Sequence, residues 1–169
     1  GNGTARLVKK SPWRDKGLGV LQDLGPHLLD IVNIWFKKKF KYKITSSNKF
    51  ENKSLDHVVI NSVSKKLRIE IEMTMCMWKN THTTDIIGSK GSVHITSLCK
   101  WGPTQIIIRK RKLPSGIPSE RKFTLSIKDP TWNLEHKYFF ELIKKRVKTN
   151  LDNDIWIYKS LRNMEKKYA

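Results

Sequence analysis

The fold is decided by residues 67–77, LRIEIEMTMCM, in which large apolar side chains alternate with polar or small ones. Strict alternation over such a length is typical of an antiparallel β-strand with one buried and one exposed face. The same period begins upstream, at Leu55, Val59 and Val63. We therefore expect a long strand over 66–78, whose Met73, Met75 and Met77 face the core rather than bind a metal through sulfur.

Working outward from this strand, shorter apolar runs and turn residues predict further elements. The other strands are expected at 4–9, 83–87, 92–97, 104–112 and 121–127, with a tight turn at 88–91. Helical spacing predicts one helix from near Leu24, with Pro26 in its first turn, a second from Pro130 or Thr131, and a third from near Asp152. The order predicts an α+β fold, a predominantly antiparallel open sheet with helices packed on one face. No long linker interrupts residues 1–169, so we expect a single domain.

The composition is strongly basic, with 34 Lys and Arg against 15 Asp and Glu, a formal net charge of +19. A basic surface attracts nucleic acid. The excess is mostly Lys, however, whereas phosphate and base recognition favours Arg. We interpret the charge as a solvated surface first, a sign of an anionic substrate second and of nucleic acid third. No apolar run is long enough to span a membrane. Cys76 and Cys99 form no disulfide framework, which favours the cytoplasm.

The candidate chemistry lies in residues 13–30, WRDKGLGVLQDLGPHLLD. On a helix, Asp23, His27 and Asp30 fall within an arc of about 60°. The predicted docking stripe is centred about 100° away. It consists of Leu24, Leu28, Ile31 and Trp35.

An imidazole between two carboxylates suits proton transfer near neutral pH. Asp followed four residues later by His is also a common cap or surface pair on helices. The three residues could also bind a metal, but the other four histidines lack ligand spacing, so no metal is expected. The residues alone leave these alternatives open.

This segment resembles the start of the C-terminal domain in the glucose–fructose oxidoreductase / inositol dehydrogenase / rhizopine-catabolism family. The pattern is Trp-Arg, a glycine-containing stretch, then Asp-x-Gly-x-His-x-x-Asp at 23–30. Residues 87–93 are similar to the family's Gly-Thr-x-Gly-Ser turn, and Trp132 to Phe140 to its Trp/Tyr-x-x-Glu-x-x-x-Phe helix. The resemblance covers nearly the whole chain. It implies an NAD(P)-dependent oxidoreductase acting on a sugar, polyol or sugar-nucleotide hydroxyl.

The resemblance also assigns roles to residues. His27 matches the family's catalytic histidine, which accepts the proton of the substrate hydroxyl, and Asp23 matches the acid that positions substrate and histidine. The expected substrate-binding residues are Arg14, Asp30, Asn133 and His136.

The chain has no Gly-x-Gly-x-x-Gly turn for NAD or NADP. The family binds that cofactor mainly through an N-terminal Rossmann domain, which also supplies a catalytic lysine from a Glu-Lys-Pro motif. Neither is in this sequence, so we expect the chain to hold part of an active site and to be inactive alone. Gly17-Leu18-Gly19 stands where the family usually has a run of glycines.

The family's sheet often pairs with another subunit, so the resemblance implies a homo-oligomer through the open sheet face. The polar side of the long strand would supply that face, with Arg68, Glu70, Glu72, Thr74 and Trp78; simple exposure to solvent is the alternative. Two functions of other classes also remain: a basic module binding nucleic acid or another polyanion, and a non-catalytic assembly domain.

Overall fold

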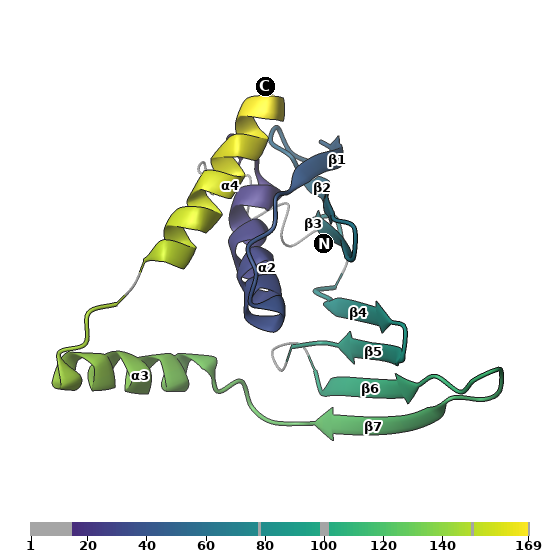
Figure 1. The fold of residues 1–169 in the computed structure, drawn as a ribbon. Helices are drawn as coiled ribbons and strands as arrows, with labels where there is room; N and C mark the ends of the chain where they lie inside the picture. The colour runs from purple at the N-terminus through teal and green to yellow at the C-terminus, as the bar shows by residue number, and fades with distance from the viewer. Residues whose placement is uncertain (1–14, 78, 99–101, 150, 169) are drawn as a thin grey trace. The chain divides into compact units, whose positions relative to one another are not determined.

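The computed structural model describes residues 15–77, 79–98, 102–149 and 151–168 (Figure 1). The described chain contains helices and two antiparallel sheets, which confirms the α+β class. It divides into two compact units, one formed by residues 1–78 with 149–169 and the other by residues 79–148. The strand predicted at 4–9, Arg14 and Trp78 lie outside the described residues.

The first unit is a three-stranded sheet covered by two helices. Its elements are α2 (Val20–Phe36), β1 (Lys43–Asn48), β2 (His57–Val63), β3 (Arg68–Thr74) and α4 (Asp152–Tyr168). The strands are antiparallel in the order β1-β2-β3. Helix α2 packs on β2, β3 and α4, while α4 also contacts β1 (Figure 1). Both helices therefore cover one face of this sheet, as predicted.

The core of the first unit follows the alternation of β3. Ile69, Ile71 and Met73 are buried against the helices, and Met75 is buried just beyond the strand. The strand ends at Thr74, however, so the prediction of a strand to residue 78 is wrong. Met77 is correspondingly 45% exposed instead of facing the core.

The predicted period of β2 is wrong by one residue. Val58 and Ile60 are fully buried, whereas Val63 is 68% exposed. Val58 pairs with Met73 and Ile60 with Ile71, so the register with β3 places these side chains on the buried face. The segment has apolar residues on both faces of the strand, so its pairing with β3 decides which face is buried.

Helix α2 begins at Val20, four residues earlier than predicted, and Pro26 lies inside it rather than in its first turn. The Val20 N–H donates to the Leu55 carbonyl at 2.7 Å, and the Val20 side chain is fully buried. Burial of this first turn offsets the helical hydrogen bond that Pro26 cannot donate. Gly19 precedes the helix with φ 50°, and a Cβ there would lie 2.1 Å from the Leu55 oxygen. Only glycine fits this approach.

The second unit contains β4 (Thr83–Gly88), β5 (Gly91–Thr96), β6 (Thr104–Lys110), β7 (Ser119–Leu125) and α3 (Thr131–Lys145). Its four strands are antiparallel in sequence order, and the turn at 88–91 is confirmed. The predicted single sheet is thus two sheets.

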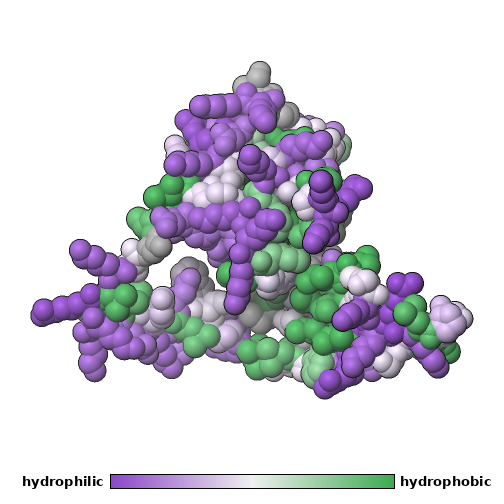
Figure 2. Space-filling view, in the orientation of Figure 1, coloured by the Kyte–Doolittle hydropathy of each residue, from purple (hydrophilic) through white to green (hydrophobic). Residues whose placement is uncertain are grey.

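None of the described side chains of the second unit is buried. One face of its sheet is nevertheless apolar. Residues paired across the four strands point to the same face, and on one face most of these residues are apolar. Apolar side chains gather over β4–β7 and α3 (Figure 2). The stripe predicted on α3 is exposed as well, with Phe139 57% and Ile143 56% accessible.

Candidate functional site

The helix that carries the candidate residues docks mainly through a face displaced from the predicted stripe, although Leu24 and Leu28 of that stripe also pack, partly buried, against the core. Its fully buried side chains include Leu21 and Leu29, and Gly25 is buried between them. These positions are displaced by about 100°, one residue, from the stripe that starts at Leu24. Asp23, His27 and Asp30 therefore project roughly opposite the buried face.

Gly25 lies in the contact between α2 and α4. A Cβ at this position would lie 3.0 Å from Leu21 Cδ1 and 3.2 Å from Leu161 Cδ2. Ile157 and Met164 of α4 are buried in the same core. The glycine of the Asp-x-Gly-x-His pattern therefore has a packing role here, which leaves the opposite side of α2 available.

His27 is exposed, whereas Asp23 is half-buried one turn before it. Within the described part of the chain, the His27 ring forms no hydrogen bond or ion pair. Asp23 does have an interaction. The imidazole is thus open to a ligand, with the half-buried Asp23 one helical turn away.

Asp30 is tied to α4 by a network that the sequence did not reveal. Asn153 Nδ2 donates to Asp30 Oδ1 at 2.6 Å, and Asn33 Nδ2 donates to Asn153 Oδ1 at 2.8 Å. The partners are more than a hundred residues apart in sequence, so no local spacing signals the contact. Asp30 is therefore a fixed carboxylate whose exposed neighbour, His27, remains open.

A hollow of about 430 Å³ opens beside this network. We call it the lysine hollow. It is lined by Asp30, Asn33, Ile34, Lys37, Lys38, Lys39 and Asn153. Lys39 Nζ donates to the Asp152 carbonyl at 3.0 Å, so one lysine also joins the end of α2 to the start of α4.

The loop before α2 is held by carboxylates. Asp15 Oδ1 accepts the backbone N–H groups of Lys53 and Ser54 at 2.9 and 3.0 Å. Asp56 is fully buried and accepts three consecutive backbone N–H groups, from residues 50–52. Burial alone would raise the Asp56 pKa, but these hydrogen bonds outweigh it and lower the pKa below its usual value. Sequence reasoning missed both residues. For Asp56 the available signal was an acid directly before an apolar run, in Leu55-Asp56-His57-Val58-Val59-Ile60.

The two candidates from α3 belong to the second unit. Asn133 and His136 are exposed, and the His136 ring lies 6.2 Å from that of Phe140. Their unit is separate from the one that contains α2, and their substrate-binding role stays a prediction. Arg14 also stays a prediction, because it lies outside the described residues.

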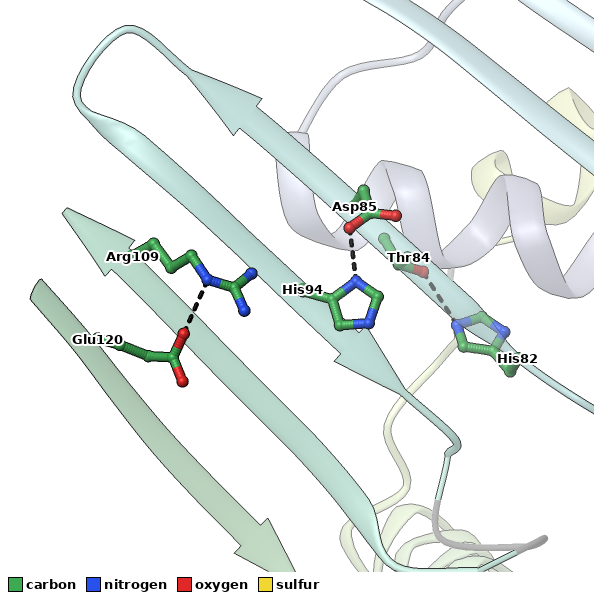
Figure 3. A network of polar contacts seen from close by, with 6 residues as sticks. All are labelled: His82, Thr84, Asp85, His94, Arg109 and Glu120. Atoms are coloured by element: carbon green, nitrogen blue, oxygen red, sulfur yellow. Dashed lines mark hydrogen bonds and ion pairs between the residues drawn. The ribbon is translucent and has the colours of Figure 1, made fainter. Parts of the chain in front are cut away.

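Polar contacts on the four-stranded sheet resemble a site but follow from strand pairing (Figure 3). His94 Nδ1 lies 2.5 Å from Asp85 Oδ1, and Arg109 Nε lies 2.8 Å from Glu120 Oε2. Both pairs are directly opposite in the antiparallel register, where opposite charges attract. Burial lowers the pKa of His82, whose ring lies 3.0 Å from Thr84 Oγ1. We assign these groups to the sheet rather than to a reaction.

Comparison with known proteins identifies the chain. A model of the oxidoreductase family, C-terminal alpha/beta domain, matches residues 2–135. The chain belongs to this oxidoreductase family. No curated protein and no solved structure matches it. The family match confirms the resemblance and includes Asp23, His27 and Asp30, but it ends within α3. Helix α4 lies beyond the match, including Asn153, which lines the lysine hollow.

No helix among the described residues combines the length and apolar character needed to cross a membrane.

Proposed function

We propose that the chain is the substrate-binding and partly catalytic portion of an NAD(P)-dependent oxidoreductase acting on a hydroxyl of a sugar, polyol or sugar nucleotide. The observation that carries the proposal is the open imidazole of His27, presented on the solvent side of a helix whose other side is docked in the core. Membership of an oxidoreductase family supports the reaction class.

A nicotinamide dinucleotide, when bound, would supply the acceptor for the hydride that leaves the substrate carbon. His27 accepts the hydroxyl proton as the carbonyl forms, because an imidazole has a proton affinity suited to transfer near neutral pH. Asp23, four residues earlier on the same helix, orients the ring and stabilises the imidazolium. Asp30, held by Asn153, contacts a second substrate hydroxyl. Arg14, Asn133 and His136 are proposed as further substrate-binding residues.

The nicotinamide dinucleotide is proposed to be held mainly by residues outside these 169. The sequence has no glycine-rich turn at a strand–helix junction that would receive its pyrophosphate. The exposed side of α2 fits a role in which this chain offers the base and the substrate contacts. Alone, the chain is therefore proposed to bind substrate without turnover.

We further propose a cytoplasmic protein that forms a homo-oligomer through the outer face of the β1–β3 sheet. The free thiol of Cys76 supports a reducing compartment; burial raises its pKa, which keeps it protonated.

Turnover of the complete protein tests the catalytic assignment. NADH or NADPH formation is measured with a panel of polyols, sugars and nucleotide sugars. We expect His27→Ala to lower kcat by about 10²–10⁴-fold, the usual contribution of a general base. Asp23→Asn should lower it less. The matched control is His57→Ala, because His57 lies on β2 beside Glu72 and outside the proposed site.

Two outcomes would contradict the assignment. Wild-type turnover in the His27→Ala protein would leave His27 as a surface residue and favour an assembly role. Binding of nucleic acid that falls steeply with salt, with no dehydrogenase activity, would favour the polyanion-binding alternative.

A further inference from the structure

Two turns are held together at one end of the β4–β7 sheet. The turn at 88–91 joins β4 to β5, and the loop at 111–118 joins β6 to β7. The Arg111 N–H donates to the Lys90 carbonyl at 2.9 Å, and Arg111 Nη1 donates to the Ser89 carbonyl at 3.4 Å. The β6–β7 loop extends beyond the ends of the strands (Figure 1). Residues 87–91 and 110–118 therefore form one projecting surface, which we call the basic tip.

The basic tip lies in a stretch of the chain with a large excess of positive charge. Residues 86–128 contain nine Lys and Arg but a single acidic residue, Glu120. Glu120 lies directly opposite Arg109 in the sheet, and their side chains form an ion pair at 2.8 Å, so this acid is already neutralised. The lysines of the tip are exposed and have no acidic partner among the described residues: Lys90, Lys110 and Lys112.

Apolar side chains project from the same tip. Ile117 is 90% exposed, Leu113 is 70% exposed, and Ile87, directly before the first turn, is 84% exposed. A single exposed apolar residue is ordinary on a protein surface, but here three share two adjoining turns. Hydrophobic and hydrophilic side chains are mixed at this end of the sheet (Figure 2). The tip thus combines unpaired positive charge with apolar groups that the fold leaves in water.

This combination favours the anionic surface of a membrane. Each basic residue near an anionic bilayer strengthens binding about fivefold. Aliphatic side chains gain free energy when they leave water for the boundary between headgroups and acyl chains. The cytoplasmic leaflet of cell membranes is anionic, which fits the proposed cytoplasmic location.

Other anionic partners fit the basic tip less well. Proteins bind single-stranded nucleic acid largely through aromatic side chains that stack on the bases, and residues 102–122 contain no aromatic residue. A stable protein partner needs a broad complementary surface, whereas two turns form a narrow projection.

We propose that the basic tip binds an anionic lipid bilayer peripherally. Leu113 and Ile117 enter the headgroup region, and Lys90, Lys110 and Lys112 contact the lipid phosphates. This interaction goes beyond the proposed function, because the tip belongs to the second unit and contains none of the proposed catalytic residues.

Sedimentation of the 169-residue chain with vesicles tests the proposal. The probes are vesicles of phosphatidylcholine alone and of phosphatidylcholine mixed equally with phosphatidylserine. We expect binding to the mixed vesicles at least about tenfold tighter than to the neutral ones, falling as salt is added. Equal binding to both kinds of vesicle would overturn the proposal.

An apolar pair of substitutions separates insertion from charge attraction. Leu113→Ser with Ile117→Ser keeps the net charge and should weaken binding to the mixed vesicles about tenfold or more, because the inserted apolar surface is lost. The control, Val63→Ser with Leu151→Ser, removes exposed apolar groups from the first unit and should change affinity less than twofold. All four side chains are exposed, so an unchanged circular dichroism spectrum is expected for both variants.

A lysine pair tests where on the chain the charge acts. Lys110→Gln with Lys112→Gln should weaken binding about tenfold or more. The control, Lys65→Gln with Lys66→Gln, removes the same charge from an exposed bend between β2 and β3 and should weaken binding less than threefold. Equal weakening by the tip pairs and their controls would overturn the proposal, since the attraction would then belong to the whole basic surface.

Single-stranded RNA provides the competing outcome. We expect a poly-uridine chain to bind more weakly than the mixed vesicles at the same salt concentration. Tighter RNA binding that is lost in the Lys110/Lys112 variant and kept in the Leu113/Ile117 variant would assign the tip to nucleic acid and overturn the proposal.

Discussion

Asp56 shows how one buried residue supports the start of α2. Its carboxylate accepts hydrogen bonds from the backbone N–H groups of residues 50–52. Just before it in the chain, the Ser54 N–H donates to Asp15, and the Leu55 carbonyl accepts a hydrogen bond from the Val20 N–H. A buried carboxylate is stable only when hydrogen bonds replace its hydration. The Asp56 carboxylate therefore stabilises the β1–β2 loop that packs against the start of α2.

We predict that Asp56→Asn lowers the free energy of unfolding by about 3 kcal/mol, because an amide cannot replace a charged acceptor of several N–H donors. The pKa of Asp56 is lower in the folded chain than in the unfolded one. Its stabilisation is thus fully present above the unfolded pKa of about 4 and is lost as the pH falls through the folded pKa. Urea unfolding between pH 2 and 7 measures both effects.

The matched control is Glu51→Gln, in the same loop, because the exposed side chain changes while the backbone donor to Asp56 stays. This variant should keep the acid dependence of the wild type. An Asp56→Asn protein with unchanged stability and an unchanged acid transition would show that the buried carboxylate contributes nothing.

At the scale of elements, the sequence was informative where one face alone is apolar. Only one face of β3 is apolar, and its buried residues were predicted correctly as far as Met75. β1, with sequence KITSSN, has no such alternation and was not predicted. It becomes a strand because it pairs with β2, and its own side chains show no strand pattern.

Helix α2 shows a second limit. Proline usually lies in the first turn of a helix, so Pro26 led to a predicted start near Leu24. The anchoring of Val20 on Leu55 is a tertiary contact that no local signal announces. For the same reason, the true docking face was misplaced by one residue.

The two sheets should differ in local stability. β2 is the central strand of its sheet and contains fully buried Val58 and Ile60, whereas no residue of the central strands β5 and β6 is buried. We predict that hydrogen exchange of β2 amides is at least about tenfold slower than that of β5 and β6, because local opening there exposes more apolar surface. Equal protection would show that the apolar face of β4–β7 is covered in solution.

At the scale of the whole molecule, the polar outer face of β3 suits a two-fold interface. Arg68, Glu70 and Glu72 are exposed on it, with both signs of charge on one strand. Across a two-fold axis, Arg68 of each copy can face an acid of the other.

We predict a homo-oligomer by light scattering, and Arg68→Glu should dissociate it by placing like charges together. Lys112→Glu, on the exposed loop after β6, makes the same charge change and should leave the mass unaltered. A strictly monomeric wild type over a wide concentration range would reject the interface.

The candidate site was only partly predictable. Asp23, His27 and Asp30 share a helix and were found by their spacing, because local periodicity fixes their relative direction. Asn153 was not found, since it reaches Asp30 from the far end of the chain. Asn133 and His136 lie in the other unit, where helix spacing carries no information about their distance from His27.

Chemical rescue tests most directly whether the His27 imidazole is the base. Because the ring is exposed, its removal leaves space that free imidazole can enter. In the complete protein with its substrate and NAD or NADP, we predict that added imidazole restores part of the turnover of His27→Ala and none in the Asp23→Asn protein. A His27→Ala enzyme as active as the wild type, or one unaffected by imidazole across its pH range, would contradict it.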